Sequence, residues 1–266
     1  MCDLPAIESS LASTIFAGKL HFSPTTASTN TDALAAARAG APHGSVFFAD
    51  EQTAGRGRGD HSWHSAAGEG LYVSVLLRPM IPASRIPLLP LAAGLAAADA
   101  IRSAAGQSPS GLRVDLRWPN DLLIGPRKTG GILVESKSES KGLPHAVVGI
   151  GINVHQRAFA PDLATPAISL DLAAGVRISR QSLLLALLKS LEHEALALAN
   201  PDAAIRIPAR VESASTWVRG RSVSVHGPQA CQGVTAGLDE HGFLRVLTAA
   251  GMVTVQTGGL RAAGND

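Results

Sequence analysis

A short run rich in glycine and arginine, residues 52–59 (QTAGRGRG), carries the strongest chemical signal in the sequence. Alternate residues of an extended chain share one face, so the side chains of Arg56 and Arg58 would point the same way. Guanidinium groups present forked donors that suit carboxylates and phosphates, and glycines let a ligand approach the backbone closely. The run therefore favours a site for one or two anions, with a flexible, solvated Gly/Arg loop as the alternative interpretation.

A second polar stretch, residues 118–121 (WPND), precedes a lysine at the start of a strand-like run. The four residues predict a rigid turn with two polar groups, Asn120 and Asp121, at its tip. Lys128 stands just before residues 130–135 (GGILVE), where a lysine can reach back into a cleft as a point charge. A hairpin with a surface lysine is the alternative for this stretch taken alone.

Motifs of several common enzyme classes are absent from the sequence. Lys128-Thr129 resembles the end of a P-loop, but no glycine precedes the lysine. The Gly-x-Gly pairs that begin at Gly55 and Gly149 are not expected to open a helix, which argues against a Rossmann fingerprint. No Gly-x-Ser-x-Gly or His-Glu-x-x-His motif occurs. Without an evident covalent nucleophile, catalysis would depend on positioning and electrostatics.

Composition limits the class of protein. Of the 266 residues, 45% are hydrophobic and 17% are charged, which excludes a wholly disordered chain. A net charge of +2 argues against a protein that coats nucleic acid, and two distant cysteines, Cys2 and Cys231, argue against a disulfide scaffold or a Cys-rich zinc site. The N-terminus has no signal-peptide pattern, and the longest apolar run, residues 86–98, is too short to span a bilayer. We expect a cytoplasmic protein that does not enter the membrane.

Helices and strands are predicted around the polar stretches. Hydrophobic periodicity and cap residues predict helices over 31–39, 88–105, 182–199 and 202–213. Apolar runs between turn residues predict strands over 45–50, 71–78, 113–118, 122–124, 132–136 and 146–154. The last strand alternates glycine with branched apolar residues, which is typical of a strand with something packed close to its backbone. Residues 51–69 are expected to form a long loop.

A change of pattern near Thr216 indicates a second, smaller unit. Four short β-like runs follow at roughly even spacing, over residues 221–225, 233–238, 243–247 and 252–256. Such spacing is typical of a small β-barrel. We therefore predict a larger domain over residues 1–215 and a small β-domain over residues 216–266.

Taken together, these motifs resemble those of the biotin–protein ligases. The matching elements occur in the order expected for that family: Ser28-Thr29-Asn30, Gln52, GRGR (55–58), Trp63, WPND (118–121), Lys128 with GGILVE, and GIGINV (149–154). The resemblance covers about residues 20–262. It implies an α+β fold, with a mixed β-sheet and helices packed on one side, followed by an SH3-like barrel.

The resemblance also implies an activity in two steps. Biotin and MgATP would give biotinyl-5′-adenylate and pyrophosphate, and the biotinyl group would then pass to one lysine of a biotin carboxyl carrier domain, as in acetyl-CoA carboxylase. Family members occur as monomers and as dimers, so either state is expected. Because the 27 residues before Ser28 are too few for a winged helix-turn-helix domain, we expect no binding to operator DNA.

Individual residues receive roles only through this resemblance. Biotin is expected to contact Ser28, Thr29, Asn30, Gln52, Arg56, Gly57, Arg58 and Lys128. The nucleotide is expected to contact Arg58, Trp63, Asn120, Lys128 and Asn153. Lys128, Arg58 and Asp121 are the candidate catalytic residues, with Asp121 orienting or deprotonating the incoming lysine. The metal ligands of MgATP are not assigned.

The sequence departs from the family pattern at two places. Asp60 and His61 stand where many family members have glycine and a basic residue, which predicts weaker retention of the adenylate or a different cap over it. In the small domain, Thr257-Gly258-Gly259-Leu260 lacks the acidic residue often found after the glycine. Two alternative functions stay open: a lipoate or octanoate ligase of related fold, and a non-catalytic biotin sensor.

Overall fold

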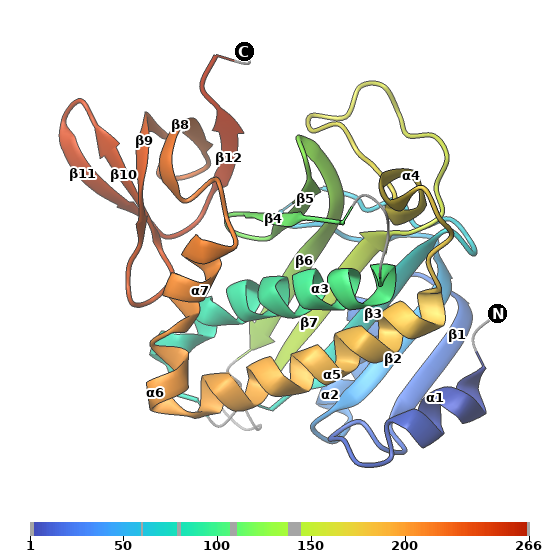
Figure 1. Cartoon of the computed structure of the whole chain (residues 1–266). Helices are drawn as coiled ribbons and strands as arrows, with labels where there is room; N and C mark the ends of the chain where they lie inside the picture. The colour runs from blue at the N-terminus through green and yellow to red at the C-terminus, as the bar shows by residue number, and fades with distance from the viewer. Residues whose placement is uncertain (1–2, 60, 79–80, 107–110, 138–144, 265–266) are drawn as a thin grey trace.

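The computed structural model describes residues 3–59, 61–78, 81–106, 111–137 and 145–264. Its larger part is a seven-stranded mixed sheet with the strand order β1-β2-β3-β7-β6-β5-β4 (Figure 1). Among the neighbouring strands of this sheet, as far as the structure describes them, β1 and β2 pair in parallel and the other neighbours are antiparallel. The strands are β1 (Leu20–Thr26), β2 (Ser45–Gln52), β3 (Gly70–Leu77), β4 (Val114–Arg117), β5 (Asp121–Ile124), β6 (Arg127–Lys137) and β7 (His145–Asn153).

Two long helices, α3 (Leu89–Ala105) and α5 (Arg180–Ala199), cross one face of this sheet (Figure 1). The composition of α3 explains its position, because leucines and alanines occupy most of the helix and nearly all of them are buried. Such a helix has almost no polar face and must be covered on several sides. The remaining helical segments are α1 (Leu4–Ser10), α2 (Thr29–Arg38), the 3₁₀ turn η1 (Ala83–Leu88), α4 (Leu170–Ala174), α6 (Pro201–Ala204) and α7 (Ile207–Ser213).

The continuous segment Ala83–Ala105 is long and apolar enough to cross a membrane by length and composition alone. In the folded chain, 67% of its apolar window is buried. Its residues belong to the main hydrophobic core together with α5 and the sheet. The segment is therefore a core helix, as the sequence predicts.

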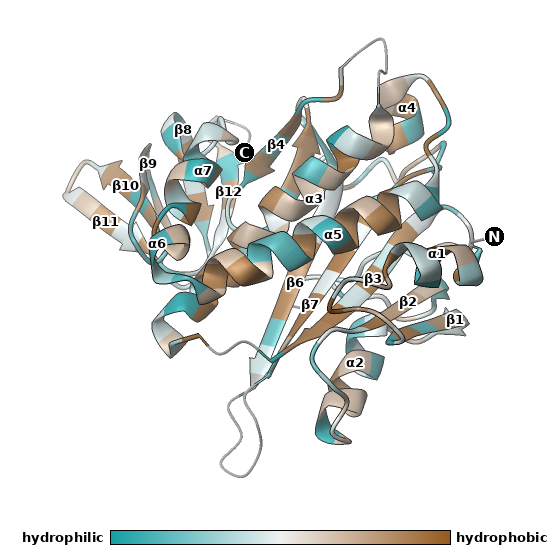
Figure 2. Cartoon of the chain, turned by 60° about the horizontal axis from the view of Figure 1, so that its bottom comes forward, coloured by the Kyte–Doolittle hydropathy of each residue, from teal (hydrophilic) through white to brown (hydrophobic). Residues whose placement is uncertain are grey.

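The opposite face of the sheet carries α2. Side chains alternate between the two faces of a strand: on β3, Val75 and Leu77 join the main core, whereas Leu76 packs against Leu34 and other residues of α2. Figure 2 shows α3 and α5 on one side of the sheet and α2 on the other. The predicted fold class is confirmed, with the addition that α2 packs on the second face and leaves the space beside it for a cleft.

The C-terminal part is a five-stranded antiparallel sheet, as expected for a small SH3-like domain. Its strands have the order β11-β10-β9-β8-β12. They are β8 (Arg219–His226), β9 (Cys231–Leu238), β10 (Leu244–Thr248), β11 (Gly251–Val255) and β12 (Gly259–Ala262).

Polar contacts join the small domain to the larger sheet. Trp118 Nε1 donates to Gly242 O at 3.0 Å, and Asp115 accepts from the backbone N and the hydroxyl of Thr216. Glu212 accepts from the backbone N of Leu238 at 2.7 Å. These contacts hold the small domain beside the β4 edge of the larger sheet (Figure 1).

Several details differ from the sequence prediction, among them the helical segments α1, η1 and α4, which were not predicted. The helix expected over 202–213 is divided into α6 and α7, because Pro208 lacks an N–H and its ring would clash with the carbonyl of Ala204. The new helix instead begins at Ile207 with the proline in its first turn. The edge strand β1 was not predicted, since it contains Pro24 and shows no regular alternation of buried residues. The fifth strand of the small sheet, β12, was also missed.

Candidate active site

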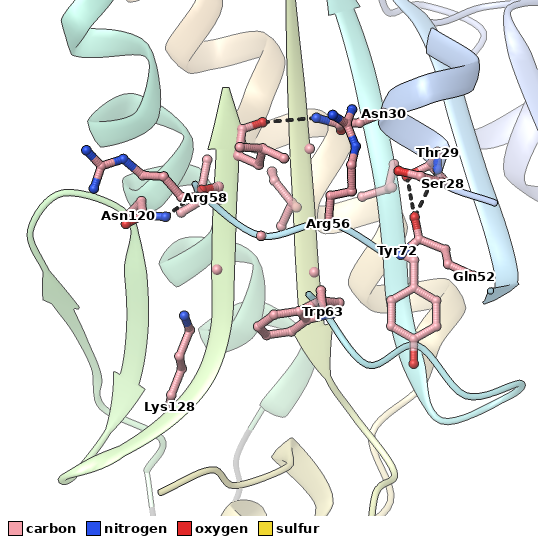
Figure 3. A pocket seen from close by; sticks show the side chains of 18 residues that line it. Ser28, Thr29, Asn30, Gln52, Arg56, Arg58, Trp63, Tyr72, Asn120 and Lys128 are labelled. Carbon is pink, nitrogen blue, oxygen red and sulfur yellow. Dashed lines mark hydrogen bonds between the residues drawn. The ribbon is translucent and has the colours of Figure 1, made fainter. Parts of the chain in front are cut away.

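A cleft of about 480 Å³, including the solvent at its mouth, opens on the α2 side of the sheet (Figure 3). It lies over the middle of β3, β7 and β6 and beneath the Gly/Arg run that follows β2. Its walls are Ser28, Thr29, Asn30, Gln52, Arg56, Gly57, Arg58, Trp63, Tyr72, Val73, Asn120, Lys128, Gly131, Ile132, Leu133, Gly149, Ile150 and Gly151. All the predicted site residues are among them except Asp121 and Asn153.

One end of the cleft is a buried hydrogen-bond network at the start of α2. Gln52 Oε1 accepts from Thr29 N at 2.9 Å and from Thr29 Oγ1 at 3.1 Å. Thr29 Oγ1 also lies 2.8 Å from Ser74 Oγ, which donates to Asn30 Oδ1 at 2.5 Å. Because each of these side chains is fixed by its neighbour, the end of the cleft presents a preset pattern of donors and acceptors, as recognition of a small polar ring requires.

The glycines of β7 make room for the residues that form the cleft. A Cβ atom on Gly149 would lie 2.0 Å from Asn30 Oδ1, and one on Gly151 would lie 2.5 Å from Trp63 Nε1. Gly151 pairs in register with Gly131 of β6, which also lies under the Trp63 ring. The expectation that something packs close to this backbone is therefore confirmed, and the packed groups are Asn30 and Trp63.

The other end of the cleft carries a cluster of three charges. Lys128 Nζ lies 2.5 Å from Asp121 Oδ1, and Arg117 donates to Asp121 Oδ2 from Nε at 3.1 Å and from Nη2 at 2.6 Å. The Lys128 ammonium also lies 5.5 Å from the centre of the Trp63 ring. Asp121 is thus held from both sides and points Lys128 along the cleft.

These neighbours change the acidity of Asp121. Burial opposes ionisation of the carboxyl group, but the positive charges and hydrogen bonds of Lys128 and Arg117 outweigh it, so the pKa of Asp121 is lowered. A carboxylate with a lowered pKa is a weak proton acceptor. The environment of Asp121 therefore favours orientation of a neighbouring ammonium group over removal of a proton.

We expect Asp121 to stabilise the fold only above acidic pH. The folded-state pKa of Asp121 is below the unfolded value of about 3.9, so the folded state binds fewer protons near that pH. The stabilisation is complete above the unfolded pKa and is lost as the pH falls through the folded pKa. In urea unfolding, the advantage of the wild type over Asp121→Asn should therefore be constant near neutral pH and shrink as the pH falls below about 5. A difference in stability that does not change with pH would contradict this assignment.

Arg58 is shared between the cleft and the small domain. Its side chain lines the cleft, while its Nη1 donates to Gly258 O at 2.5 Å and its Nη2 donates to Thr257 Oγ1. Burial lowers the pKa of the Arg58 guanidinium, and the negative charge of Asp121 opposes this shift. In Figure 3 the guanidinium extends away from the centre of the cleft. Arg58 must therefore leave the small domain if its guanidinium is to meet an anion at the centre.

Two predicted site residues, Asp121 and Asn153, lie outside the cleft wall. Asp121 lies beside the cleft and contacts Lys128. Asn153, the last residue of β7, is buried, and its amide lies 3.5 Å from Ile168 O. Asn120 lines the cleft, and its amide donates to Ile132 O at 2.8 Å. Asp60 lies outside the described residues, and the neighbouring His61 accepts from Gly57 N through its backbone oxygen.

Several cleft-forming residues were not predicted. Tyr72 and Val73 line the cleft from β3, and Ser74 of the same strand joins the buried hydrogen-bond network. Their positions depend on which strands pair with β3, and sequence patterns do not give this pairing. Glu135 stands at the end of the GGILVE run and pairs with Arg56, 79 positions away in sequence. Alternation along β6 was the only available signal for Glu135, because it places Glu135 on the same face as Gly131 and Leu133.

The part of the chain that the structure describes contains no group of three or more His, Cys, Asp or Glu residues placed to hold a metal ion. Within the same residues, the indole nitrogen of Trp63 is buried and has no hydrogen-bond partner. Buried donors are normally paired. This nitrogen lies over the bare backbone of Gly151.

Comparison with known proteins places this arrangement in a family. Residues 22–153 match the Biotin/lipoate A/B protein ligase family. The biotin--[acetyl-CoA-carboxylase] ligase of Mycobacterium tuberculosis is 34% identical over 236 residues, which cover 88% of this chain and 85% of the relative. The bifunctional ligase/repressor BirA of Bacillus subtilis is 43% identical over 155 residues, or 58% of this chain, and the match spans only 46% of that relative.

The fold has close counterparts among solved structures. The biotin protein ligase from Aquifex aeolicus, solved in complex with biotin and ATP, superposes with a TM-score of 0.78 at 29% identity. The match covers 92% of this chain and all of the Aquifex chain. Sequence and structure agree, and the chain belongs to the biotin/lipoate A/B protein ligase family.

Proposed function

We propose that this protein is an ATP-dependent biotin–protein ligase that acts through biotinyl-5′-adenylate. The observation that carries the proposal is the cleft itself, which joins a preset polar network at one end to the Lys128 ammonium at the other. The family to which the chain belongs supports the same reaction, since the Mycobacterium and Aquifex proteins are named as biotin ligases.

The first step joins two negatively charged groups. An oxygen of the biotin carboxylate attacks the α-phosphorus of ATP, the bond from that phosphorus to the departing oxygen breaks, and pyrophosphate leaves. Lys128 is placed to reduce the repulsion between the two acids, and a preorganised cation is most effective where charge develops in the transition state. Mg²⁺ enters as part of the substrate MgATP.

The second step transfers the biotinyl group to a protein. The amine of a lysine attacks the acyl carbon, the bond from that carbon to the phosphate oxygen breaks, AMP leaves, and the amine loses a proton. We propose that the acceptor is a lysine of a biotin carboxyl carrier domain, as the name of the Mycobacterium relative implies. The ionised Asp121 would attract the incoming ammonium, and its lowered pKa makes it a poor candidate for the base.

The remaining residue roles follow the same geometry. The network of Ser28, Thr29, Asn30 and Gln52 would hold the polar ring of biotin. Trp63 lies across Gly131 and Gly151 and would separate the biotin end from water. Arg58 would turn from Thr257 to the phosphate once the adenylate forms. We propose that the enzyme works in the cytoplasm, as a monomer or homodimer, and without binding nucleic acid.

Two experiments test the proposed function. Mass spectrometry of a carrier domain after incubation with this protein, biotin and MgATP should show the mass of one biotinyl group on one lysine. Lipoate or octanoate should fail to compete with biotin, and transfer of either would favour the alternative ligase. Biotin binding without pyrophosphate release would instead identify a non-catalytic sensor.

We expect Arg58→Ala to shorten the lifetime of the bound adenylate by about tenfold or more, because it removes a charge-assisted contact to the phosphate. Chromatography measures this lifetime by monitoring release and hydrolysis of the adenylate in the absence of a carrier domain. The exposed Arg113→Ala variant is the control. Thr257→Val removes only the hydroxyl that Arg58 contacts and should have a smaller effect. An unchanged lifetime in Arg58→Ala would remove the proposed role.

A further inference from the structure

Glu135 of β6 is a carboxylate at the edge of a cleft that is proposed to bind two anions. Its oxygens are occupied by two residues from other elements: Arg56 donates from Nη1 to Oε1 at 3.2 Å and from Nη2 to Oε2 at 2.6 Å. Asn30 Nδ2 of α2 donates to Oε2 at 2.9 Å. Glu135 therefore connects the Gly/Arg run, the first turn of α2 and the central sheet.

The pairing occupies both arms of the Arg56 guanidinium. A forked pair with a carboxylate is the strongest contact that arginine commonly makes. If Arg56 turned to a ligand, Glu135 would be left as an uncompensated negative charge beside the incoming carboxylate or phosphate. The cations at the other end of the cleft, Lys128 and Arg58, can attract the ligand without leaving the Glu135 carboxylate unpaired.

The contact between Arg56 and Glu135 also bears on the backbone around Arg56. Arg56 forms a bridge with Ser62, between two backbone hydrogen bonds: Gly57 N donates to His61 O at 2.6 Å and Trp63 N donates to Gly55 O at 2.9 Å. A contact that holds Arg56 in place therefore also holds the two backbone segments that these bonds join, residues 55–57 and 61–63. The contact between Arg56 and Glu135 therefore adds to the backbone hydrogen bonds that hold Trp63 over the cleft.

Glu135 also determines which way the Asn30 amide faces. An ionised carboxylate only accepts hydrogen bonds, so the amide group of Asn30 must turn its nitrogen toward Glu135 and its oxygen toward Ser74. Asn30 Oδ1 then meets the bare backbone of Gly149. The charge on Glu135 thereby sets the donor and acceptor pattern at the polar end of the cleft.

We propose that Glu135 is a positioning residue with two effects. Its contact with Arg56, which we call the latch, holds the Gly/Arg run against β6, and its contact with Asn30 fixes the orientation of the Asn30 amide. The consequence for biotin rests on the proposed function, whereas the latch itself is a property of the unliganded protein. Arg56 then belongs to the latch and not to the set of cations that touch the ligand.

A double-mutant cycle in the unliganded protein tests the latch. Hydrogen exchange of the Gly57 and Trp63 amides should accelerate about threefold to tenfold in Glu135→Ala and in Arg56→Ala. The double variant should exchange no faster than either single variant, because both remove the same contact. Asp99→Asn and Arg102→Ala, which break an exposed pair on α3 with matched changes of charge, are the controls and should leave the exchange unchanged. Unchanged exchange in Glu135→Ala, or additive effects in the double variant, would overturn the latch.

Steady-state kinetics with biotin test whether Glu135 fixes the orientation of the Asn30 amide. Glu135→Gln lets the Asn30 amide face either way and should raise the KM for biotin about threefold to tenfold with kcat within about twofold. Tighter biotin binding in Glu135→Ala would overturn the proposal, since it would mean that Arg56 is a ligand contact released by the substitution. If the wild-type protein released no pyrophosphate while the exchange cycle behaved as expected, the proposed function would fail and the latch would stand.

Discussion

Lys128→Ala should lower the rate of pyrophosphate release from biotin and MgATP by about two orders of magnitude or more, the usual effect of removing one preorganised group that stabilises transition-state charge. The Lys128 ammonium is the cation that the structure aims along the cleft, held by Asp121 at 2.5 Å and placed over the Trp63 ring. Its backbone is fixed as well, because Lys128 N donates to Pro166 O and Lys128 O accepts from Ile168 N. A coupled assay for pyrophosphate measures the rate.

The fold should survive this substitution, because Asp121 keeps the two hydrogen bonds from Arg117. An unchanged far-UV circular dichroism spectrum would separate lost chemistry from lost structure. Lys189→Ala, at an exposed position of α5, provides a control with the same change of charge and should keep the wild-type rate. Near-normal pyrophosphate release by Lys128→Ala would remove this lysine from the reaction.

Gly149→Ala should weaken biotin binding by about tenfold or more while leaving the protein folded. The new methyl group would lie 2.0 Å from Asn30 Oδ1, so the Asn30 side chain would have to move. That movement breaks its hydrogen bonds to Ser74 and Glu135, and a buried polar group that loses its partners costs about 1 to 3 kcal/mol. Isothermal titration with biotin measures the loss.

Gly94→Ala is the matched control for this prediction. Gly94 is buried in α3, but a Cβ there would lie 3.6 Å from Leu116 Cδ2, which is ordinary contact. Alanine is the better helix former by about 1 kcal/mol, so this variant should bind biotin normally and unfold at a higher temperature. Equal biotin affinity in the two variants would show that the space over Gly149 is not required for binding.

Much of the site could be predicted because its parts are local in sequence. Hydroxyl and amide residues before an Ala-rich run predicted a helix from residue 31, and the structure begins that helix two residues earlier, at Thr29. The alternating glycines of β7 predicted a close approach to the backbone. Residues whose function depends on type and immediate spacing, such as Lys128 before GGILVE, were identified from the sequence and line the cleft.

The contacts between distant residues could not be predicted in the same way. Arg58 reaches Thr257, 199 positions later, and Arg56 reaches Glu135, 79 positions later. Such pairs follow from the strand order of the sheet and the placement of the small domain, which no local pattern encodes. The lowered pKa of Asp121 has the same origin, since Arg117 and Lys128 meet the carboxylate only after β4, β5 and β6 have paired.

The floor of the cleft has a consequence for inhibitor design. Gly149 and Gly151 present backbone atoms where other pockets present side chains. Any substitution at these positions adds atoms that collide with Asn30 or Trp63, so it would disturb the residues that form the cleft. For a compound that takes most of its contacts from the peptide groups of this floor, few substitutions should weaken binding of the compound without also disturbing the cleft.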